Sequence, residues 1–187
     1  MAKTELTKQL EKELYNLIRK VGTFACFEVT IGFNGKERVD LLTYNTKGIW
    51  RCYEIKVSKQ DFYSKSAHTF VGHYNYFVMP DQLFKEVKKD IPKYVGVYVL
   101  TDKNYLQSVK KASKQKLKVS KNILQDSMIR SLYYNVDKQI NSNNELIIDR
   151  LNRTINRLEK ELKDKRKAYI ELSNELFNLK HNNRKVW

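Results

Sequence analysis

The sequence runs Arg38-Val-Asp-Leu-Leu-Thr-Tyr44 and then, after a short turn, Ile49-Trp-Arg-Cys-Tyr-Glu-Ile-Lys-Val57. Both runs are rich in β-branched and aromatic residues, so they predict two strands joined as a hairpin. Thirteen residues separate Asp40 in the first run from Glu54 in the second. Lys56 lies two residues beyond Glu54 and therefore projects from the same face of the strand.

Carboxylates inside apolar strands are unfavourable unless they are paired or bind a cation. Hairpin pairing of the two runs would bring Asp40 near Glu54, and hard oxygen ligands of this kind suit Mg²⁺ or Mn²⁺. The sequence therefore predicts a divalent metal site made by Asp40 and Glu54, with the ammonium group of Lys56 beside it. The alternative is a cluster of ion pairs on an exposed face of the sheet.

The elements around the hairpin follow from apolar spacing and turn residues. A two-residue turn is predicted at Asn34-Gly35, because this dipeptide favours tight hairpins. The predicted order is helix, three strands, helix, strand, helix, strand and a last helix, which indicates an α/β domain with a mixed sheet over residues 1–140. The predicted helices are 4–20, 59–72, 81–89 and 122–140, and the predicted strands are 24–33, 37–44, 49–57, 74–79 and 95–100.

The C-terminal part has a different pattern, which begins after the polar stretch Asn141-Ser-Asn-Asn144. Apolar residues recur every seven positions in two series offset by three, which is typical of a coiled coil. The segment 145–180 is therefore predicted to be a coiled-coil helix that forms a homodimer, parallel or antiparallel. Two alternatives are a helix that packs on its own domain and a helix that binds another protein. The two series are Ile148, Ile155, Leu162, Tyr169, Leu176 and Leu151, Leu158, Lys165, Leu172, Leu179.

The chain is strongly basic, with a net charge of +15 and a pI near 9.7. The segment 145–180 holds nine basic and seven acidic residues, so most of this charge belongs to the α/β domain. Such a charge favours a polyanionic partner, and we expect DNA. Residues 103–121 carry seven lysines and no acid, and they are the predicted phosphate-contacting surface, although a solubilising loop is the alternative. The candidate DNA-binding residues are Lys103, Lys110, Lys111, Lys114, Lys116 and Lys118.

Location is predicted from what the sequence does not contain. It has no apolar run long enough to span a membrane, and its first residues lack the apolar region of a signal peptide. Cys26 and Cys52 fall in predicted strands without metal-ligand spacing, so we expect both to be small core residues in a reducing compartment. These features predict a cytoplasmic protein, nucleoid-associated or in the cytoplasm of a host cell, with no membrane partner.

The arrangement Arg38-Val39-Asp40, thirteen residues, Glu54-Ile55-Lys56 resembles the PD-(D/E)xK nuclease superfamily, and the predicted αβββαβ order resembles its restriction-endonuclease-like core. Residues 4–135 are similar to archaeal Holliday-junction resolvases and to MmcB-like DNA-repair proteins. The likeness to the second group rests on Glu-Ile-Lys-Val-Ser-Lys-Gln-Asp-Phe (54–62) and Tyr-Asn-Tyr-Phe-Val-Met-Pro (74–80). The superfamily's proline before the aspartate is replaced by Val39.

The resemblance implies a role for each site residue. Asp40, Glu54 and the carbonyl of Ile55 would bind Mg²⁺ or Mn²⁺, and Lys56 would be the catalytic lysine. Glu11 of the first helix, with Glu13 as the alternative, would act on the metal through water. The implied activity is metal-dependent hydrolysis of DNA in repair, recombination or mobile-element biology, phage included. Two alternatives are a non-catalytic DNA-binding module on the same fold and an adaptor that recruits a partner through its coiled coil.

Overall fold

The computed structural model describes residues 3–33, 35, 37–64, 69–142 and 144–182. The chain divides into two compact units, residues 1–134 and 135–187. The predicted boundary at Asn141–Asn144 falls within the second unit, between the last two helices. The elements, in order, are α1 (Glu5–Ile18), β1 (Thr23–Thr30), β2 (Arg38–Asn45), β3 (Trp50–Ile55), α2 (Lys59–Phe62), β4 (Tyr74–Pro80), α3 (Asp81–Val87), β5 (Gly96–Leu100), β6 (Leu106–Lys110), α4 (Lys121–Ser142) and α5 (Glu145–Asn182).

The first unit contains a six-stranded sheet in the order β1-β2-β3-β4-β5-β6. Strands β1, β2 and β3 are antiparallel, β3, β4 and β5 are parallel, and β5 and β6 are antiparallel. The predicted α/β class with a mixed sheet is therefore confirmed. Strand β6 was not predicted, because its surroundings are rich in lysine and its buried side chain, Leu106, stands alone among them.

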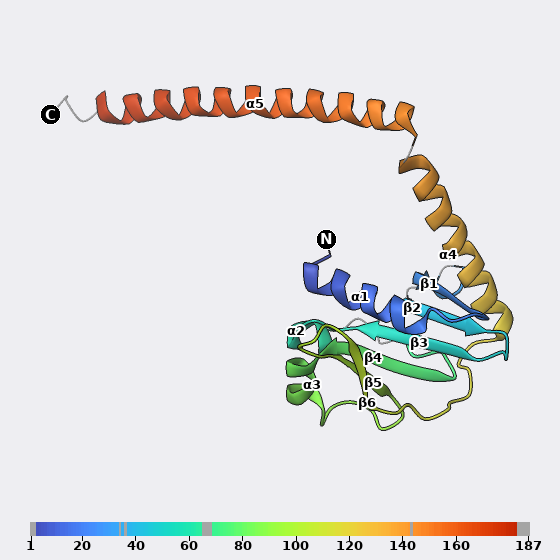
Figure 1. Cartoon of the computed structure of the whole chain (residues 1–187). Coiled ribbons are helices and arrows are strands. Elements are labelled where there is room, and N and C mark those ends of the chain that lie inside the picture. Colours follow the sequence, from blue (N-terminus) through green and yellow to red (C-terminus); the bar gives the residue numbers. More distant parts are fainter. Residues whose placement is uncertain (1–2, 34, 36, 65–68, 143, 183–187) are drawn as a thin grey trace. The chain divides into compact units, whose positions relative to one another are not determined.

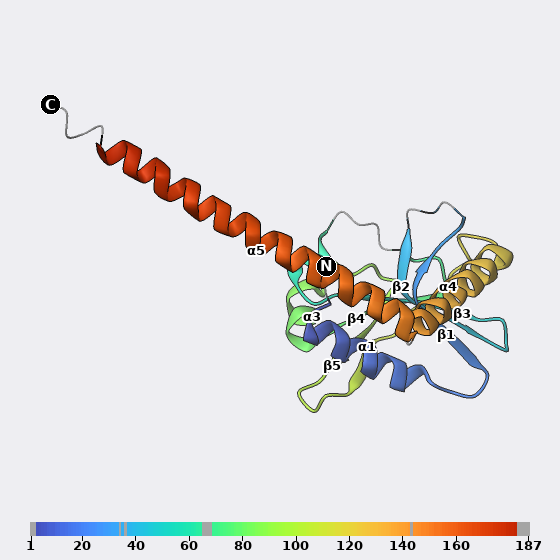
Figure 2. The ribbon, with the colours of Figure 1, turned by 90° about the horizontal axis from the view of Figure 1, so that it is seen from above.

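Helix α1 lies across one face of the sheet (Figures 1 and 2). Thr4 caps its N-terminus by accepting a hydrogen bond from the Thr7 N–H at 3.2 Å. Leu10 and Leu14 are fully buried on the sheet-facing side, where they pack in one cluster with Leu41 and Tyr53. The helical spacing of these leucines is what the sequence predicted, and it fixes which side of α1 faces β3.

The opposite face of the sheet carries two further clusters. Cys26, Leu42 and Cys52 pack there against Leu124 and Met128 of α4. Next to them, the apolar side chains of α3 and β4 form the other cluster, which includes Leu83, Phe77 and Met79. Cys26 and Cys52 are both buried core residues, as predicted.

The β1–β2 connection is longer than the predicted two-residue hairpin. Strand β1 ends at Thr30 and not at residue 33, and the Ile31 N–H bonds the Glu37 carbonyl at 3.0 Å. Helix α4 holds this connection, because Arg130 donates to the carbonyls of Thr30 at 3.2 Å and Gly32 at 2.6 Å. Asn34, half of the predicted turn, lies outside the described residues.

The second predicted helix, 59–72, is also wrong in its extent, because α2 ends at Phe62. Residues 69–71 are non-helical and buried, and Gly72 approaches β3 so closely that a Cβ atom would lie 3.1 Å from the Cys52 backbone nitrogen. This close approach to the sheet requires an extended path that a continued helix would not provide. Residues 65–68 lie outside the described part of the chain.

The C-terminal segment forms the long helix α5, and its apolar heptad side chains are exposed along it, among them Leu151, Leu158 and Leu172. None of the helices in the described residues is long and apolar enough to cross a membrane.

Candidate metal and nucleic-acid site

The β2–β3 ladder stops at a carboxylate. Its last paired residues are Leu41 and Tyr53, one position short of Asp40 and Glu54. Beyond that point the Ile55 N–H donates to Oδ2 of Asp40 at 2.7 Å and not to a backbone carbonyl of β2. The half-buried Asp40 side chain thus bridges the place where the two strands separate.

Glu54 lies deeper, on the face of the sheet opposite α1, where it stands in register with Phe77 of β4. The residue is only 4% exposed, and its Oε1 has no hydrogen-bond partner among the described residues. Burial, and next the negative charge of Asp40, raise the pKa of Glu54 to about 8, while Lys56 and the Thr69 N–H oppose this rise. Burial also raises the pKa of Asp40 above its ordinary value.

Lys56 is buried beside the two carboxylates. Its backbone N–H continues the β3–β4 ladder to the Val78 carbonyl at 2.9 Å. Its ammonium lies 3.4 Å from Oδ1 of Asp61. A buried ammonium with no partner would be costly, so the ion pair with Asp61 offsets part of the cost of burying Lys56.

Asp61 lies in the first turn of α2, and its N–H donates to the hydroxyl of the N-cap residue Ser58 at 3.1 Å. Its Oδ2 also accepts the Val57 N–H at 3.1 Å. The sequence signal for Asp61 is the capping motif that begins at Ser58, two residues after Lys56, because it places an acid in the first turn of the helix.

The Ile55 carbonyl is directed toward the two carboxylates. The C=O and N–H of a trans peptide point in opposite directions, and the described residues contain no cis peptide bond. The Lys56 N–H points to β4, so the carbonyl of Ile55 points to the side of β3 on which Asp40 lies. Two carboxylates and a carbonyl oxygen are hence available at one place.

These residues fit a hard divalent cation. Among the described residues no donor reaches the buried Oε1 of Glu54, and the carboxylate of Asp40 lies beside it, so a cation would relieve both the desolvation and the repulsion. Within the described residues, no group of three or more His, Cys, Asp or Glu side chains is placed to hold a metal. A metal here would therefore take its remaining ligands from backbone and water, which is usual for Mg²⁺.

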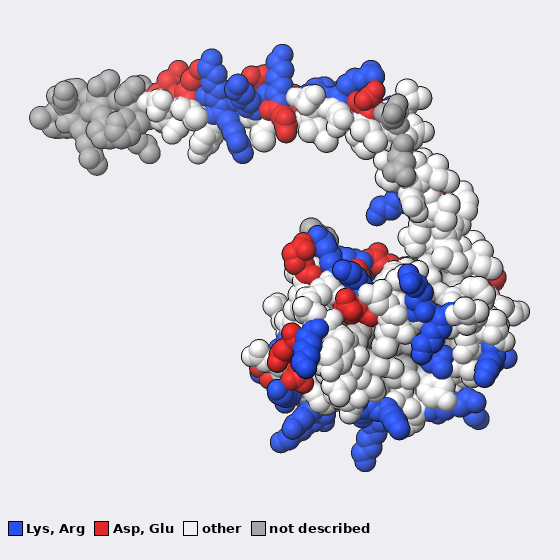
Figure 3. All heavy atoms as spheres, in the orientation of Figure 1, with Lys and Arg blue, Asp and Glu red and all other residues white. Residues whose placement is uncertain are grey.

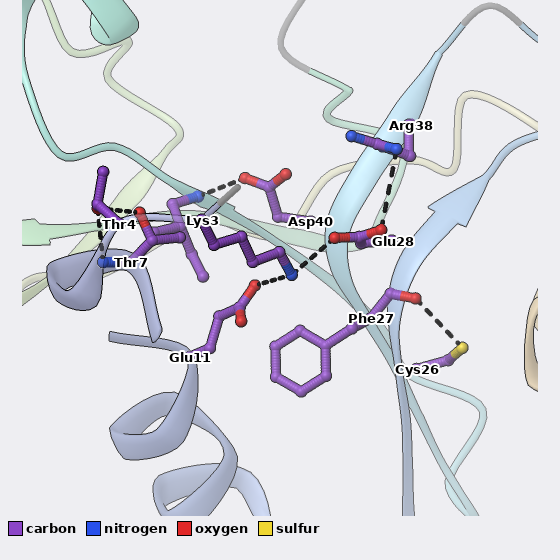
Figure 4. Close-up of polar contacts among 10 residues, drawn as sticks. Lys3, Thr4, Thr7, Glu11, Cys26, Phe27, Glu28, Arg38 and Asp40 are labelled. Atoms are coloured by element: carbon purple, nitrogen blue, oxygen red, sulfur yellow. Dashed lines mark hydrogen bonds and ion pairs between the residues drawn. The ribbon is translucent and has the colours of Figure 1, made fainter. Parts of the chain in front are cut away.

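Glu11 does not join this group directly. Its Oε1 accepts from the Lys3 ammonium at 2.6 Å, and the same ammonium contacts Oε1 of Glu28 at 2.6 Å (Figure 4). Glu28 has a positive φ of 55° and lies opposite Asp40, between the paired residues on either side. The Lys3 cluster, which we define as Lys3, Glu11 and Glu28, links α1 to the strand beside Asp40.

The Lys3 cluster was missed from the sequence, because neither Lys3 nor Glu28 belongs to a motif. Of the two candidate acids of the first helix, Glu11 is the one with a contact that leads through Lys3 to Glu28 of β1, whereas the contacts described for the chain include none for Glu13. Glu11 comes from the face of the sheet that α1 covers, whereas Glu54 is on the other face. Among the described contacts, none joins Glu11 to Asp40 or Glu54.

The candidate DNA-binding lysines fall into two kinds. Lys110 ends β6, and its half-buried ammonium donates to the carbonyls of Pro92 at 2.7 Å and Ile91 at 3.4 Å. Burial lowers the pKa of Lys110. These contacts engage the Lys110 ammonium within the fold, and its role as a phosphate contact stays a prediction. Lys103 is exposed in the turn before β6.

The other lysines follow β6 on an extended segment. Leu117 and Val119 turn inward and pack against the core cluster that contains Cys52. Lys114, Lys116 and Lys118, at the positions that alternate with these two residues, are exposed, and so is Lys111 at the start of the segment. Burial raises the pKa of the Cys52 thiol to about 12; the charge of Glu54 adds to this rise and the charge of Lys118 opposes it. We call this set the lysine row: Lys111, Lys114, Lys116 and Lys118.

Basic and acidic side chains are unevenly distributed on the surface of the first unit. Figure 3 shows Lys and Arg along the lower edge of the unit in that view, with few Asp or Glu side chains between them. Acidic side chains gather elsewhere on the same view. One edge of the unit therefore offers a surface that a polyanion could follow.

Comparisons with known proteins show the fold and nothing finer. No family model matches the chain, and no curated protein matches it. A solved structure that does match is described as a protein of unknown function, SPO1766, from Silicibacter pomeroyi. The two share 17% identity with a TM-score of 0.56, over 74% of this chain and 91% of that one. The likeness shows that this α/β architecture occurs in a second protein.

Proposed function

We propose that the chain is a metal-dependent DNA endonuclease with a restriction-endonuclease-like core of the PD-(D/E)xK type. The observation that carries the proposal is the buried Oε1 of Glu54, which has no hydrogen-bond partner among the described residues and lies beside Asp40, at the point where β2 and β3 separate. The order α1-β1-β2-β3-α2-β4 supports it, because it is the order that the resemblance implies.

Each site residue has a role in this proposal. Asp40, Glu54 and the Ile55 carbonyl would hold Mg²⁺ or Mn²⁺, which would polarise the phosphate and lower the pKa of a bound water. The Lys56 ammonium would orient the attacking water or stabilise the charge that develops on the phosphate. Asp61 keeps that ammonium in place, and Glu11, which Lys3 holds, would act on the metal only through water.

DNA reaches this site from the lysine row. Leu117 and Val119, which lie among the row's lysines, pack on the cluster that contains Cys52, and Cys52 and Glu54 are two residues apart on one face of β3. A DNA backbone bound along the row would therefore lie on the side of the sheet that carries Glu54. Lysines contact phosphates as point charges and do not distinguish bases, so binding is weakly sequence-specific. The cellular setting that we propose is cytoplasmic DNA repair, recombination or mobile-element biology.

The exposed heptad side chains of α5 favour a coiled coil. Nine of the ten core positions in the two heptad series are apolar or aromatic, and those that the structure describes are exposed, so a second copy would bury them. A homodimer brings two catalytic centres to one DNA molecule. Another protein with a matching heptad helix is the alternative partner.

The second candidate is a non-catalytic DNA-binding module or adaptor on the same fold. Two observations favour it: Glu11 is paired with Lys3, and the described residues hold no group of three metal-ligating side chains. In that case the basic unit anchors DNA while α5 recruits a partner.

A cleavage assay separates the two candidates. The full chain is incubated with Mg²⁺ or Mn²⁺ and with duplex, single-stranded, flap and four-way-junction DNA. We expect cleavage that Asp40→Asn and Glu54→Gln abolish while DNA affinity is kept, because each change removes a charge and preserves shape. Asp102→Asn, an exposed acid in the turn before β6, is the matched control and should cleave normally. Metal-dependent DNA binding without cleavage of any substrate would replace the nuclease by the second candidate.

A further inference from the structure

The α1-covered face of the sheet holds a polar cavity of about 340 Å³ near the end of α1. It lies on the opposite face of β3 from Glu54, since Arg51 and Tyr53 alternate with Cys52 and Glu54 along the strand. The cavity is therefore separate from the carboxylate site. Its size is within the range of small-ligand pockets.

The floor of the cavity is a row of three tyrosines from three adjacent strands. The rings of Tyr53 and Tyr76 are stacked, with centroids 5.1 Å apart and an interplanar angle of 15°. Tyr98 extends the row, with its centroid 5.2 Å from that of Tyr76. A Cβ atom on Gly96 would lie 2.6 Å from ring carbons of Tyr76, so the glycine is what leaves space for this ring.

Arg51 brings a charge to the same place. Its guanidinium lies 5.5 Å from the centroid of the Tyr74 ring and bonds the side chain of Tyr76. The positive charge of Arg51 opposes the burial that raises the pKa of Tyr53, Tyr76 and Tyr98, so it acts on all three phenols. No described carboxylate forms an ion pair with it.

The composition of the wall identifies the ligand class. Lys20 supplies a second cation and Thr43 a hydroxyl, and none of the residues that line the cavity is acidic. The tyrosine rings already cover one another, so the row offers phenol groups and few free ring faces. A guanidinium that forms no ion pair with a described carboxylate, with other hydrogen-bond donors around it, can bind a compact oxyanion. The planar guanidinium also matches the geometry of a phosphate group.

We propose that this cavity binds a phosphate monoester through Arg51 and the tyrosine row. The monoester is either a free mononucleotide or the terminal phosphate of a polynucleotide. The site does not depend on the proposed nuclease activity, because it lies on the other face of the sheet and needs no divalent metal.

The test uses the full chain in EDTA and measures the melting temperature and the binding isotherm with inorganic phosphate, thymidine 5′-monophosphate and thymidine. We expect both phosphates to raise the melting temperature and thymidine not to do so. Arg51→Gln should reduce affinity at least about tenfold, which is the size of one charge-assisted hydrogen bond. Lys47→Gln, which removes one exposed charge from the β2–β3 turn, is the matched control and should bind normally.

Two features keep the test decisive. Phosphate stabilises many proteins through exclusion from their surface, so an equal rise for the wild type and Arg51→Gln would overturn the proposal. If Arg51→Gln does not fold, Tyr98→Phe removes a single hydroxyl from a half-buried ring, and unchanged binding by this variant would also overturn it. A 5′-phosphorylated oligonucleotide that binds more tightly than its 5′-hydroxyl form, in an Arg51-dependent way, identifies a polynucleotide end as the source. Arg51-dependent binding of thymidine monophosphate, with no difference between the two oligonucleotides, identifies a free nucleotide as the source.

Discussion

Asp40 accepts the Ile55 N–H at 2.7 Å and so takes the place of a backbone carbonyl at the end of the β2–β3 ladder. This contact holds the carboxylate beside Glu54, although the two acids repel each other. The burial and the mutual repulsion of the two acids lower the stability of the fold when no cation is bound between them. The cost should be measurable, because it depends on pH.

We expect the metal-free protein to lose stability as the pH rises from about 5 to about 8. Glu54 has a pKa of about 8 in the folded chain against an ordinary value of 4.5, so in this window the folded state binds a proton that the unfolded state has released. The free energy of unfolding then falls by on the order of 1 kcal/mol per pH unit. Denaturant titrations of the wild type and Glu54→Gln at several pH values test this, and the variant should show a flatter profile.

Mg²⁺ or Mn²⁺ should counteract that loss. Because protons compete for the same carboxylate, the rise in melting temperature with metal should be larger at pH 8 than at pH 6. Glu86→Gln, an exposed acid paired with Lys59 at 3.4 Å, is a matched control and should respond as the wild type does. A metal effect of equal size in Glu54→Gln would exclude Glu54 as a ligand.

The carboxylate pair was the most predictable part of the molecule. Strand period and turn composition together fixed the positions of Asp40 and Glu54, and the ladder bears out their adjacency. The extent of α2 was not predictable, because it depends on the close approach of Gly72 to β3, which is a tertiary contact. The Lys3 cluster joins α1, β1 and the residue Lys3 before α1 through contacts between residues eight or more positions apart, and no periodicity indicates such contacts.

The lysine-rich segment is basic as a whole, but the structure places its lysines in different surroundings. Lys110 ends a strand whose pairing with β5 turns its ammonium to the carbonyls of Ile91 and Pro92. The sequence alone does not distinguish this lysine from Lys111 beside it. That difference provides an internal control for the predicted DNA interface.

The pairing of Lys56 with Asp61 should appear as a coupling energy. Asp61→Asn keeps an oxygen for the Val57 N–H but removes the charge, and we expect it to cost about 1–2 kcal/mol because Lys56 is then buried without its partner. In a Lys56→Met background the same change should cost about 1 kcal/mol less. A double-mutant cycle by denaturant unfolding measures the difference. If the cost of Asp61→Asn is the same in both backgrounds, the 3.4 Å contact contributes no stability.

DNA affinity should depend steeply on salt through the lysine row. Replacing Lys114, Lys116 and Lys118 together by Gln should reduce the slope of log affinity against log salt by up to about 3, because each phosphate that a lysine neutralises adds about 0.9 to the slope. Fluorescence anisotropy over a range of salt concentrations measures the slope.

Lys110→Gln is the matched control for that experiment. It removes one charge from the same segment, yet it should leave the slope unchanged and lower the melting temperature, because the carbonyls of Ile91 and Pro92 lose their donor. A slope that changes equally in both proteins would show that only net charge matters and that the row is no interface.

The exposed heptad of α5 leads to the last prediction. A dimer through residues 148–179 would place the Lys165 side chains of both copies at core positions, where the long stems reach outward at a cost in stability. Lys165→Leu should therefore raise the melting temperature of the dimer, while Lys167→Leu, on a different side of the helix, should not.

Cutting the chain after Asn144 should leave a folded monomer, because the clusters on both faces of the sheet lie within residues 1–134. That monomer should nick one strand of a duplex where the full chain cuts both. Sedimentation that shows the intact chain to be monomeric at micromolar concentration would contradict the dimer, and it would favour a helix that packs on its own domain or binds a different protein.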